Sequence, residues 1–414
     1  MSEPWGLPLL ELARQWLQDT LPAAVIYPSY TPLFLLVLGL VALQYARIAR
    51  MEAGLYGQPL VPTWHRVLTA LAAGLVGGFV GAMVMMATGV VLEPRDALPL
   101  WPVALALAFI RPRFMCFAYA TGVIGVSALL VGWPDVHVPG LVALVGALHL
   151  AEAILVYIDG AEGATPVLAR NGRGEVVGGY LMQRFWPVPA AILVLLHMPA
   201  PGQGIAMPDW WPLVRPAPLQ AADPAAVAVA ALPLLAALGY TDVALTAPPG
   251  VRSRRMALGL VGYGAALMAM AVLAERHALW AWPAVLASPL LHEAMIFAGL
   301  ARERWGRPAF GPAADGLRVL WVGPRSQAAR LGLEPGDVIL TVNGQPVRRP
   351  ADLRDASGPY AHYLRLEVRR GSRSLTLETN RFDPAAPLGL LLVPPPDEPA
   401  QPVIDLGGKR LFGT

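Results

Sequence analysis

The stretch GLRVLWVGPRSQAARLGLEPGDVILTVNGQPV, residues 316–347, alternates short apolar runs with turns rich in Gly, Pro and Asn. Gly332 and Gly336 allow the positive φ that a tight turn needs, and Pro335 fixes φ at a turn corner. The pattern predicts a small α+β domain. Its predicted elements are strands at residues 317–322, 337–344, 363–370 and 374–379, and helices at 326–331 and 350–356.

The rest of the chain has a very different composition. Of the 414 residues, 56% are hydrophobic and 14% are charged, whereas about a quarter of the residues of soluble proteins are charged. The apolar excess lies almost wholly before residue 300, which predicts a membrane region followed by a water-exposed domain. A single cysteine, Cys116, excludes a disulfide framework and predicts no cysteine-based metal cluster. The net charge of +3 predicts no nucleic-acid partner.

Apolar segments long enough to cross a bilayer recur before residue 300. A transmembrane helix needs roughly 20 apolar residues, and this criterion predicts a polytopic α-helical bundle of eight or nine spans. The first 30 residues mix polar and apolar side chains, so we expect an amphipathic helix along the membrane interface there. The predicted spans are residues 31–46, 67–92, 97–111, 115–133, 138–158, 186–199, 224–246, 256–274 and 278–300.

The distribution of arginine predicts the orientation of these spans. If the spans alternate, fourteen arginines lie in loops on one side of the membrane and four on the other. Positive charge in short loops favours the cytoplasm. We therefore predict a multi-pass protein of the cell membrane, in contact with the lipid bilayer, with the C-terminal domain and the loop 159–185 in the cytoplasm. An Asn-Gly-Arg-Gly turn predicts a hairpin in that loop, either a solvated connector or a platform that seats the C-terminal domain or a partner.

Residues 316–347 closely resemble the PDZ family, whose members bind an extended peptide as a strand between a sheet edge and a helix. The resemblance implies a loop whose backbone amides hold the peptide carboxylate. Before the first strand, GPAADGLRV matches this loop poorly. APLGLLLVP, residues 386–394, matches better and implies the circularly permuted bacterial type, although an ordinary core strand would look similar. The residues implied for peptide binding are Leu388, Gly389, Leu390, Leu391, Leu392, Leu353 and Ala356.

The PDZ domain is predicted to occupy residues 308–395, and the Pro- and Gly-rich residues 396–414 are predicted to be a flexible tail. The transmembrane bundle, residues 31–303, contains a His-Glu pair in SPLLHEAMIFAGL, residues 288–300. A zinc protease needs a second histidine one helical turn after the first, but residue 296 is isoleucine. Ser127 lacks the Gly-x-Ser-Gly setting of a serine protease. We therefore predict no enzyme activity, no metal and no cofactor.

Ionisable side chains inside a membrane cost several kcal/mol unless they are paired. We interpret those in the predicted spans as an interhelical hydrogen-bonded network that fixes the packing of the bundle. A proton or ion path is the alternative, but the chain has no convincing internal repeat of the kind that transporters show. The residues concerned are His149, Glu152, Asp242, His292 and Glu293.

The whole layout resembles the multi-pass PDZ proteins of Gram-positive bacteria typified by MinJ. The resemblance rests on residues 149–189, on PLLHEAMIFAGLARE at residues 289–303 and on the PDZ domain. It implies a topological factor of cell division, a non-catalytic adaptor at the septum or poles that links a DivIVA-type scaffold to a MinD-type ATPase. The alternative is a regulator that presents substrates to a membrane protease; an intramembrane protease or a transporter is a minor alternative.

Overall fold

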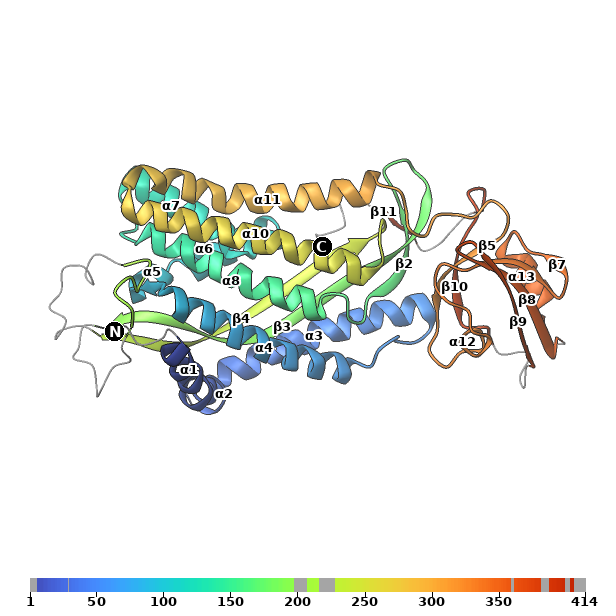
Figure 1. The fold of residues 1–414 in the computed structure, drawn as a ribbon, viewed down its shortest axis with the longest axis horizontal. Helices are drawn as coiled ribbons and strands as arrows, with labels where there is room; N and C mark the ends of the chain where they lie inside the picture. The colour runs from blue at the N-terminus through green and yellow to red at the C-terminus, as the bar shows by residue number, and fades with distance from the viewer. Residues whose placement is uncertain are drawn as a thin grey trace.

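The computed structural model describes residues 6–28, 30–196, 207–215, 228–358, 361–380, 387–398 and 403–405. It shows an elongated bundle of helices and strands with a small domain at one end (Figure 1). Within the part of the chain that the structure describes, five helices are long and apolar enough to cross a membrane. They are α3 (Thr31–Tyr56), α4 (Thr63–Thr88), α8 (Val138–Asp159), α10 (Pro249–Arg276) and the run of η3 (Ala278–Trp280) and α11 (Ala281–Trp305).

Shorter elements lie between and before these helices. Near the N-terminus, Trp16 is buried and packs edge-on against Phe79 of α4, with 5.3 Å between the ring centroids. This contact places the N-terminal helices against the bundle. The short elements are α1 (Gly6–Gln15), a π-helical turn (Trp16–Thr20), α2 (Leu21–Ile26), β1 (Val91–Leu92), α5 (Pro94–Ala97), α6 (Leu100–Ile110), a 3-10 turn (Pro112–Met115) and α7 (Phe117–Val131).

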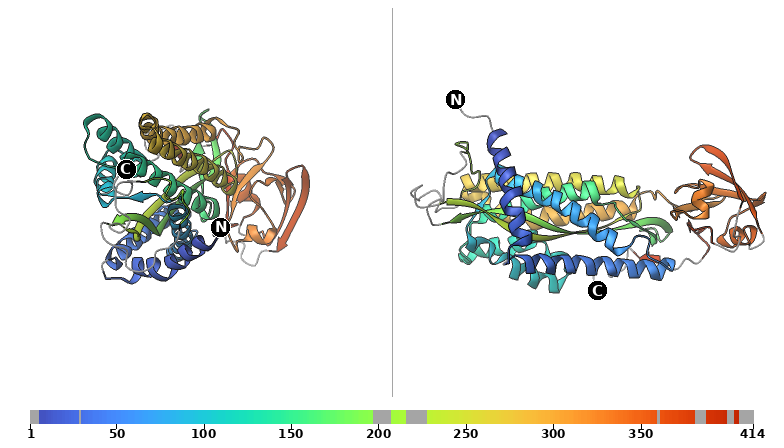
Figure 2. Two further views of the ribbon diagram at one scale, coloured as in Figure 1. Left: turned by 60° about the vertical axis from the view of Figure 1, so that its left-hand side comes forward. Right: turned by 90° about the horizontal axis from the view of Figure 1, so that it is seen from below.

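Two of the predicted helical spans are wrong. The described residues of 186–199 and 224–246 belong mainly to long strands, β3 (Val176–Leu196) and β4 (Ala228–Ala244). These strands pair antiparallel over the whole length of β4 and run along the bundle axis (Figure 1). Figure 2 shows them between the N-terminal helices and α10. A strand buried on both faces is as apolar as a membrane helix, so composition alone does not separate the two.

The ends of the outer edge of β3 are paired with other strands. Residues Val176–Leu181 pair antiparallel with β2 (Thr165–Arg170), so the predicted hairpin is present but continues into the bundle beyond residue 185. At the other end, Leu193 and Val194 pair with β1 in parallel. Only the middle of the edge therefore needs another way to satisfy its backbone groups.

A tyrosine and two prolines account for three positions in the middle of that edge. The Tyr45 hydroxyl accepts from the N–H of Phe185 and donates to its carbonyl oxygen, both at 3.1 Å. Pro187 and Pro189 follow at alternate positions and have no N–H to satisfy. Pro233 of β4 stands opposite Ala191, in the same alternation. All three prolines therefore avoid the positions that donate within the β3–β4 ladder.

Glycines of α4 let the helix approach this edge of β3. A Cβ atom on Gly74 would lie 2.1 Å from the carbonyl oxygen of Pro187. A Cβ atom on Gly78 would lie 2.1 Å from the carbonyl oxygen of Pro189. The next face of the helix lies close to α8, because a Cβ atom on Gly77 would lie 2.7 Å from the side chain of Leu155. Small residues allow such close approach in membrane proteins. The glycine spacing of α4 is thus set by the strand and helix beside it.

The C-terminal domain is a sheet with two short helices. Its strands follow the order β10-β5-β6-β8-β9, with β7 on β6, and all of these neighbours pair antiparallel. A buried core of aliphatic side chains fills it. The elements are β5 (Leu317–Val322), α12 (Gln327–Leu331), β6 (Val338–Val342), β7 (Gln345–Pro346), α13 (Pro350–Ala356), β8 (Tyr363–Arg370), β9 (Arg373–Asn380) and β10 (Leu390–Val393).

Most of the predicted tail, residues 396–414, lies outside the described residues. Val403–Asp405 form β11, which pairs in parallel with residues 168–170 of β2, next to the turn of the hairpin. These three residues extend the sheet of the bundle, within the segment for which the sequence predicts a flexible tail.

The fit of α4 against β3 can be tested with alanine at a single glycine. Gly78→Ala places a methyl group against a backbone carbonyl that cannot rotate away, and we expect it to cost about 1–3 kcal/mol of stability, as overpacking does. Gly262→Ala in α10, where an added Cβ atom has nothing within 4 Å, is the control and should be neutral or slightly stabilising. Thermal unfolding of the full chain in detergent measures both; equal melting temperatures for the two variants would contradict the packing.

Candidate functional site

β10 lies at the end of the sheet of the C-terminal domain. It pairs antiparallel with β5 from Leu390 opposite Val322 to Val393 opposite Arg318, with a register shift after Leu391. Among the described residues β10 is last in the strand order and no strand pairs with its other edge, so that edge is available to a further strand. The strand that sequence analysis predicted for the groove is thus an edge strand.

The loop before β10 has its carbonyl groups turned into the domain. Ala328 donates its N–H to the Leu388 carbonyl oxygen at 2.9 Å, and Gly323 donates to that of Gly389 at 2.7 Å. In a trans peptide the following N–H points opposite to the carbonyl. The amides of Gly389 and Leu390 therefore point away from these donors. Two successive amides of this kind are suited to hold a carboxylate.

Gly389 has the conformation that the loop requires. Its φ is +73°, which is strained for residues with a side chain. A Cβ atom at this position would also lie 2.5 Å from Cβ of Ser326. Both observations explain why glycine stands between Leu388 and Leu390.

The side chains of β10 divide between two surfaces. Leu390 and Leu392 pack, partly buried, against the core of the C-terminal domain, in the same cluster as Leu353 and Ala356 of α13. Leu391 packs instead into the cluster shared with the bundle, together with Val393. Of the predicted peptide-binding residues, Leu391 therefore directs its side chain to the bundle and not to the groove.

A cavity of about 500 Å³ lies beside the first turn of α13 and the segment that follows β10. Its charged lining residues include Arg348, Arg349, Asp352 and Asp397. The backbone N–H groups of Arg348 and Arg349 donate to the Asp352 carboxylate and lower its pKa. The cavity therefore presents both signs of charge at one end of the apolar surface between β10 and α13.

The C-terminal domain is docked on the hairpin of the bundle. The Tyr180 hydroxyl donates to the Leu320 carbonyl oxygen at 2.6 Å. The Gly178 N–H donates to the Phe310 carbonyl oxygen at 2.8 Å. The ring of Trp321 lies 6.0 Å from that of Tyr56 at the end of α3. The face of β5 and β10 opposite the domain core is thus covered by the bundle.

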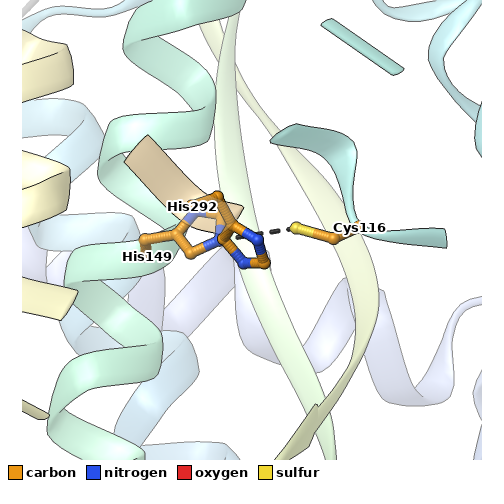
Figure 3. Close-up of side chains that lie close together, drawn as sticks. All are labelled: Cys116, His149 and His292. Atoms are coloured by element: carbon orange, nitrogen blue, oxygen red, sulfur yellow. Dashed lines mark hydrogen bonds between the residues drawn. The ribbon is translucent and has the colours of Figure 1, made fainter. Parts of the chain in front are cut away.

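Four of the predicted intramembrane polar residues come together in the bundle. His149 Nε2 lies 3.8 Å from a carboxylate oxygen of Glu152. The ring centroids of His149 and His292 are 5.4 Å apart. Glu293 accepts from the Tyr119 hydroxyl at 2.7 Å. Their cluster also contains Cys116, which the sequence analysis did not connect with them, and Figure 3 shows it beside the two histidines.

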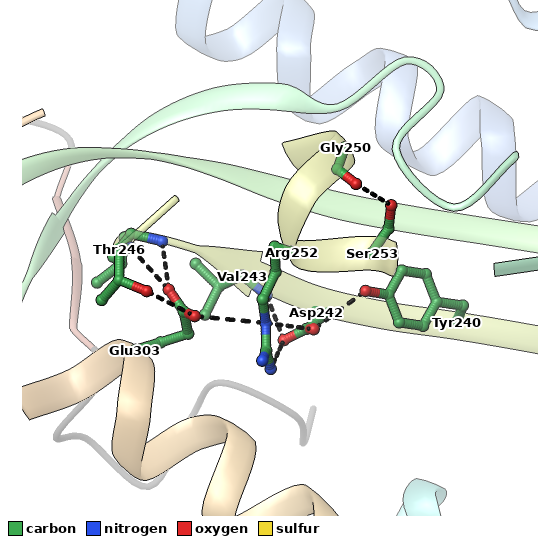
Figure 4. Close-up of polar contacts among 9 residues, drawn as sticks. Tyr240, Asp242, Val243, Thr246, Gly250, Arg252, Ser253 and Glu303 are labelled. Atoms are coloured by element: carbon green, nitrogen blue, oxygen red, sulfur yellow. Dashed lines mark hydrogen bonds and ion pairs between the residues drawn. The ribbon is translucent and has the colours of Figure 1, made fainter. Parts of the chain in front are cut away.

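Asp242 lies in a different cluster, so the single network predicted from the sequence is wrong in this respect. Asp242 pairs with Arg252 at 2.9 Å and accepts from the Tyr240 hydroxyl at 3.0 Å. Glu303 of α11 lies 3.5 Å from the same guanidinium and accepts from two backbone amides after β4 (Figure 4). This cluster ties β4, α10 and α11 together beside the docked domain.

Comparison with known proteins agrees with this layout. Residues 318–370 match the PDZ domain family. The chain is 24% identical over 401 residues to the cell division topological determinant MinJ of Bacillus subtilis (strain 168), which covers 89% of this chain and 90% of that protein. It is 26% identical over 329 residues to the probable cell division topological determinant MinJ of Lacticaseibacillus paracasei, 78% of this chain and 84% of that protein. The magnetosome formation protease MamE of Magnetospirillum gryphiswaldense is 41% identical over 70 residues, 16% of this chain and 9% of that protein, in a PDZ domain match.

Docking of the domain on the bundle can be tested at Gly178. A Cβ atom there would lie 2.7 Å from Leu320 and 2.9 Å from Val393. We expect Gly178→Val to separate the domain from the hairpin and to speed chymotryptic cleavage after Phe310, which is buried against Tyr180 of the hairpin in the wild type. Gly250→Val is the control, because a Cβ atom on Gly250 has nothing within 4 Å. If both variants are cleaved at the wild-type rate, the contact does not hold the domain.

Proposed function

We propose that the chain is a non-catalytic, membrane-anchored adaptor that binds peptide segments of partner proteins in the groove between β10 and α13. The observation that carries the proposal is the free edge of β10, preceded by two amides that point away from the domain. PDZ domains bind peptides by adding a strand to such an edge. A carboxylate would lie at the amides of Gly389 and Leu390, with the last side chain toward Leu353 and Ala356.

The position of this loop after the last long strand supports the circularly permuted bacterial order. β9 ends at Asn380, and β10 returns beside β5 at the opposite end of the strand order. The loop that leads into β10 then supplies the amides. The poorer match before β5 lacks this arrangement, because Gly316 packs against the backbone of Ile339.

Division-site placement is the cellular role that fits best. The two relatives named as cell division topological determinants match most of the chain, through the bundle as well as the PDZ domain. A protein of this kind, with its PDZ domain in the cytoplasm, would link a DivIVA-type scaffold to a MinD-type ATPase at the septum or poles. Regulation of a membrane protease is the second candidate, since the match to MamE shows that related PDZ domains occur in proteases.

Groove binding is tested by filling the site for the last side chain. We expect Ala356→Phe to lower affinity for C-terminal peptides about tenfold or more, because a buried terminal side chain contributes about 1.5–3 kcal/mol. Asp355→Phe, on the exposed face of α13, is the matched control. Titration of the full chain in nanodiscs with a library of fluorescent C-terminal peptides measures both. Equal affinities for the two variants would place the peptide elsewhere.

The cellular role is tested by imaging a fluorescent fusion in dividing cells of the source organism. We expect foci at septa or poles, and we expect recovery of division proteins with the wild-type chain but not with Ala356→Phe. A uniform membrane signal, together with recovery of a membrane protease, would favour the second candidate.

A further inference from the structure

A cysteine and two histidines from three segments meet inside the bundle (Figure 3). Cys116 directly precedes α7, His149 lies in α8 and His292 in α11, and one donor atom from each lies within 4.8 Å of the others. The Cys116 Sγ atom is 3.4 Å from His149 Nε2. Tetrahedral zinc, with bonds of about 2.3 Å to sulfur and about 2.0 Å to nitrogen, holds such ligands roughly 3.3–3.6 Å apart. Side-chain movements of roughly 1 Å would bring all three donors to these separations.

Hydrogen bonds place the proton of each histidine on Nδ1. His149 Nδ1 lies 2.8 Å from the Val145 carbonyl oxygen, which can only accept. His292 Nδ1 lies 3.1 Å from the Tyr119 hydroxyl, whose own proton is donated to Glu293. Both Nε2 atoms therefore carry lone pairs. Metal-binding histidines are oriented in this way by partners of their second nitrogen.

A fourth ligand stands beside the three. A Glu152 carboxylate oxygen lies 3.8 Å from His149 Nε2, and 18% of its side chain is exposed. One thiolate, one carboxylate and a divalent cation sum to zero charge, which suits an apolar interior. A monovalent soft cation such as Cu⁺ would leave one negative charge. We propose that Cys116, His149, His292 and Glu152 form a zinc site that joins the start of α7 to α8 and α11.

Zinc binding requires loss of the thiol proton to solvent, because the thiolate is the ligand. The Arg113 and Glu293 side chains beside the site are 26% and 20% exposed at the surface of the chain, and we place the exit of the released proton there. Without zinc, the Cys116 thiol donates a hydrogen bond to His149 Nε2. The two states therefore differ in the reactivity of one thiol, and Cys116 is the only cysteine in the chain.

The experiment uses the full chain, purified in detergent with a histidine-free affinity tag and assayed for metals by mass spectrometry. We expect near-stoichiometric zinc in the wild type and in His277→Gln, whose histidine is exposed and outside the cluster. Cys116→Ser and His149→Gln should lose it, and Glu152→Gln should bind it more weakly. Zinc-free wild type, or zinc that persists in Cys116→Ser, would overturn the proposal.

Alkylation of the wild-type chain tests the site without any variant. We expect added Zn²⁺ to slow the reaction of Cys116 with iodoacetamide several-fold and a chelator to restore the rate. An alkylation rate that does not change with Zn²⁺ would show that Cys116 and His149 share only a hydrogen bond.

Discussion

The outer edge of β3 is the constraint on which the bundle depends. In an apolar environment each unpaired backbone N–H is costly, which is why open strand edges are avoided there. This chain satisfies the edge piece by piece, with β2 and β1 at its ends, the Tyr45 hydroxyl at Phe185 and proline at two further positions. The helix that covers those prolines must in turn lack side chains where it meets their carbonyl groups. The close approach of β3 therefore requires glycine at these positions of α4, and glycine on the adjacent face of α4 allows α8 to pack closely as well.

The same strand connects the bundle to the PDZ domain. β3 has 21 residues, about 69 Å at roughly 3.3 Å per residue, and is much longer than the hydrocarbon thickness of a bilayer, about 30 Å. Its first residues contact Phe310 and Leu320 of that domain. Since the bundle covers one face of β5 and β10 and the domain core covers the other, the edge of β10 remains for a ligand. Docking therefore orients the groove as well as anchoring it.

The two halves of the chain differed in how far their structure could be predicted. The strand at 317–322 and the helix at 350–356 form where predicted, because Gly and Pro mark the turns between them. In the bundle, apolar composition indicated burial but not the type of element. The available signal was proline at residues 187 and 189, since prolines two apart suit an extended chain better than a helix interior. That pattern was outweighed by the length of the apolar runs.

The polar clusters show a second limit of spacing rules. The spacing rule for a zinc helix would give His292 a partner one turn away, whereas the structure brings His149 and Cys116 to it from other segments. Asp242, which looked equivalent in the sequence, is paired with Arg252 and leaves no comparable set of lone pairs. In the Asp242 cluster the carboxylate oxygens accept from an arginine, and this ion pair holds the elements together. In the other cluster the neutral imidazoles are held through Nδ1, so their Nε2 atoms stay available to bind a ligand. The difference lies in the tertiary partners of each group, which no local pattern records.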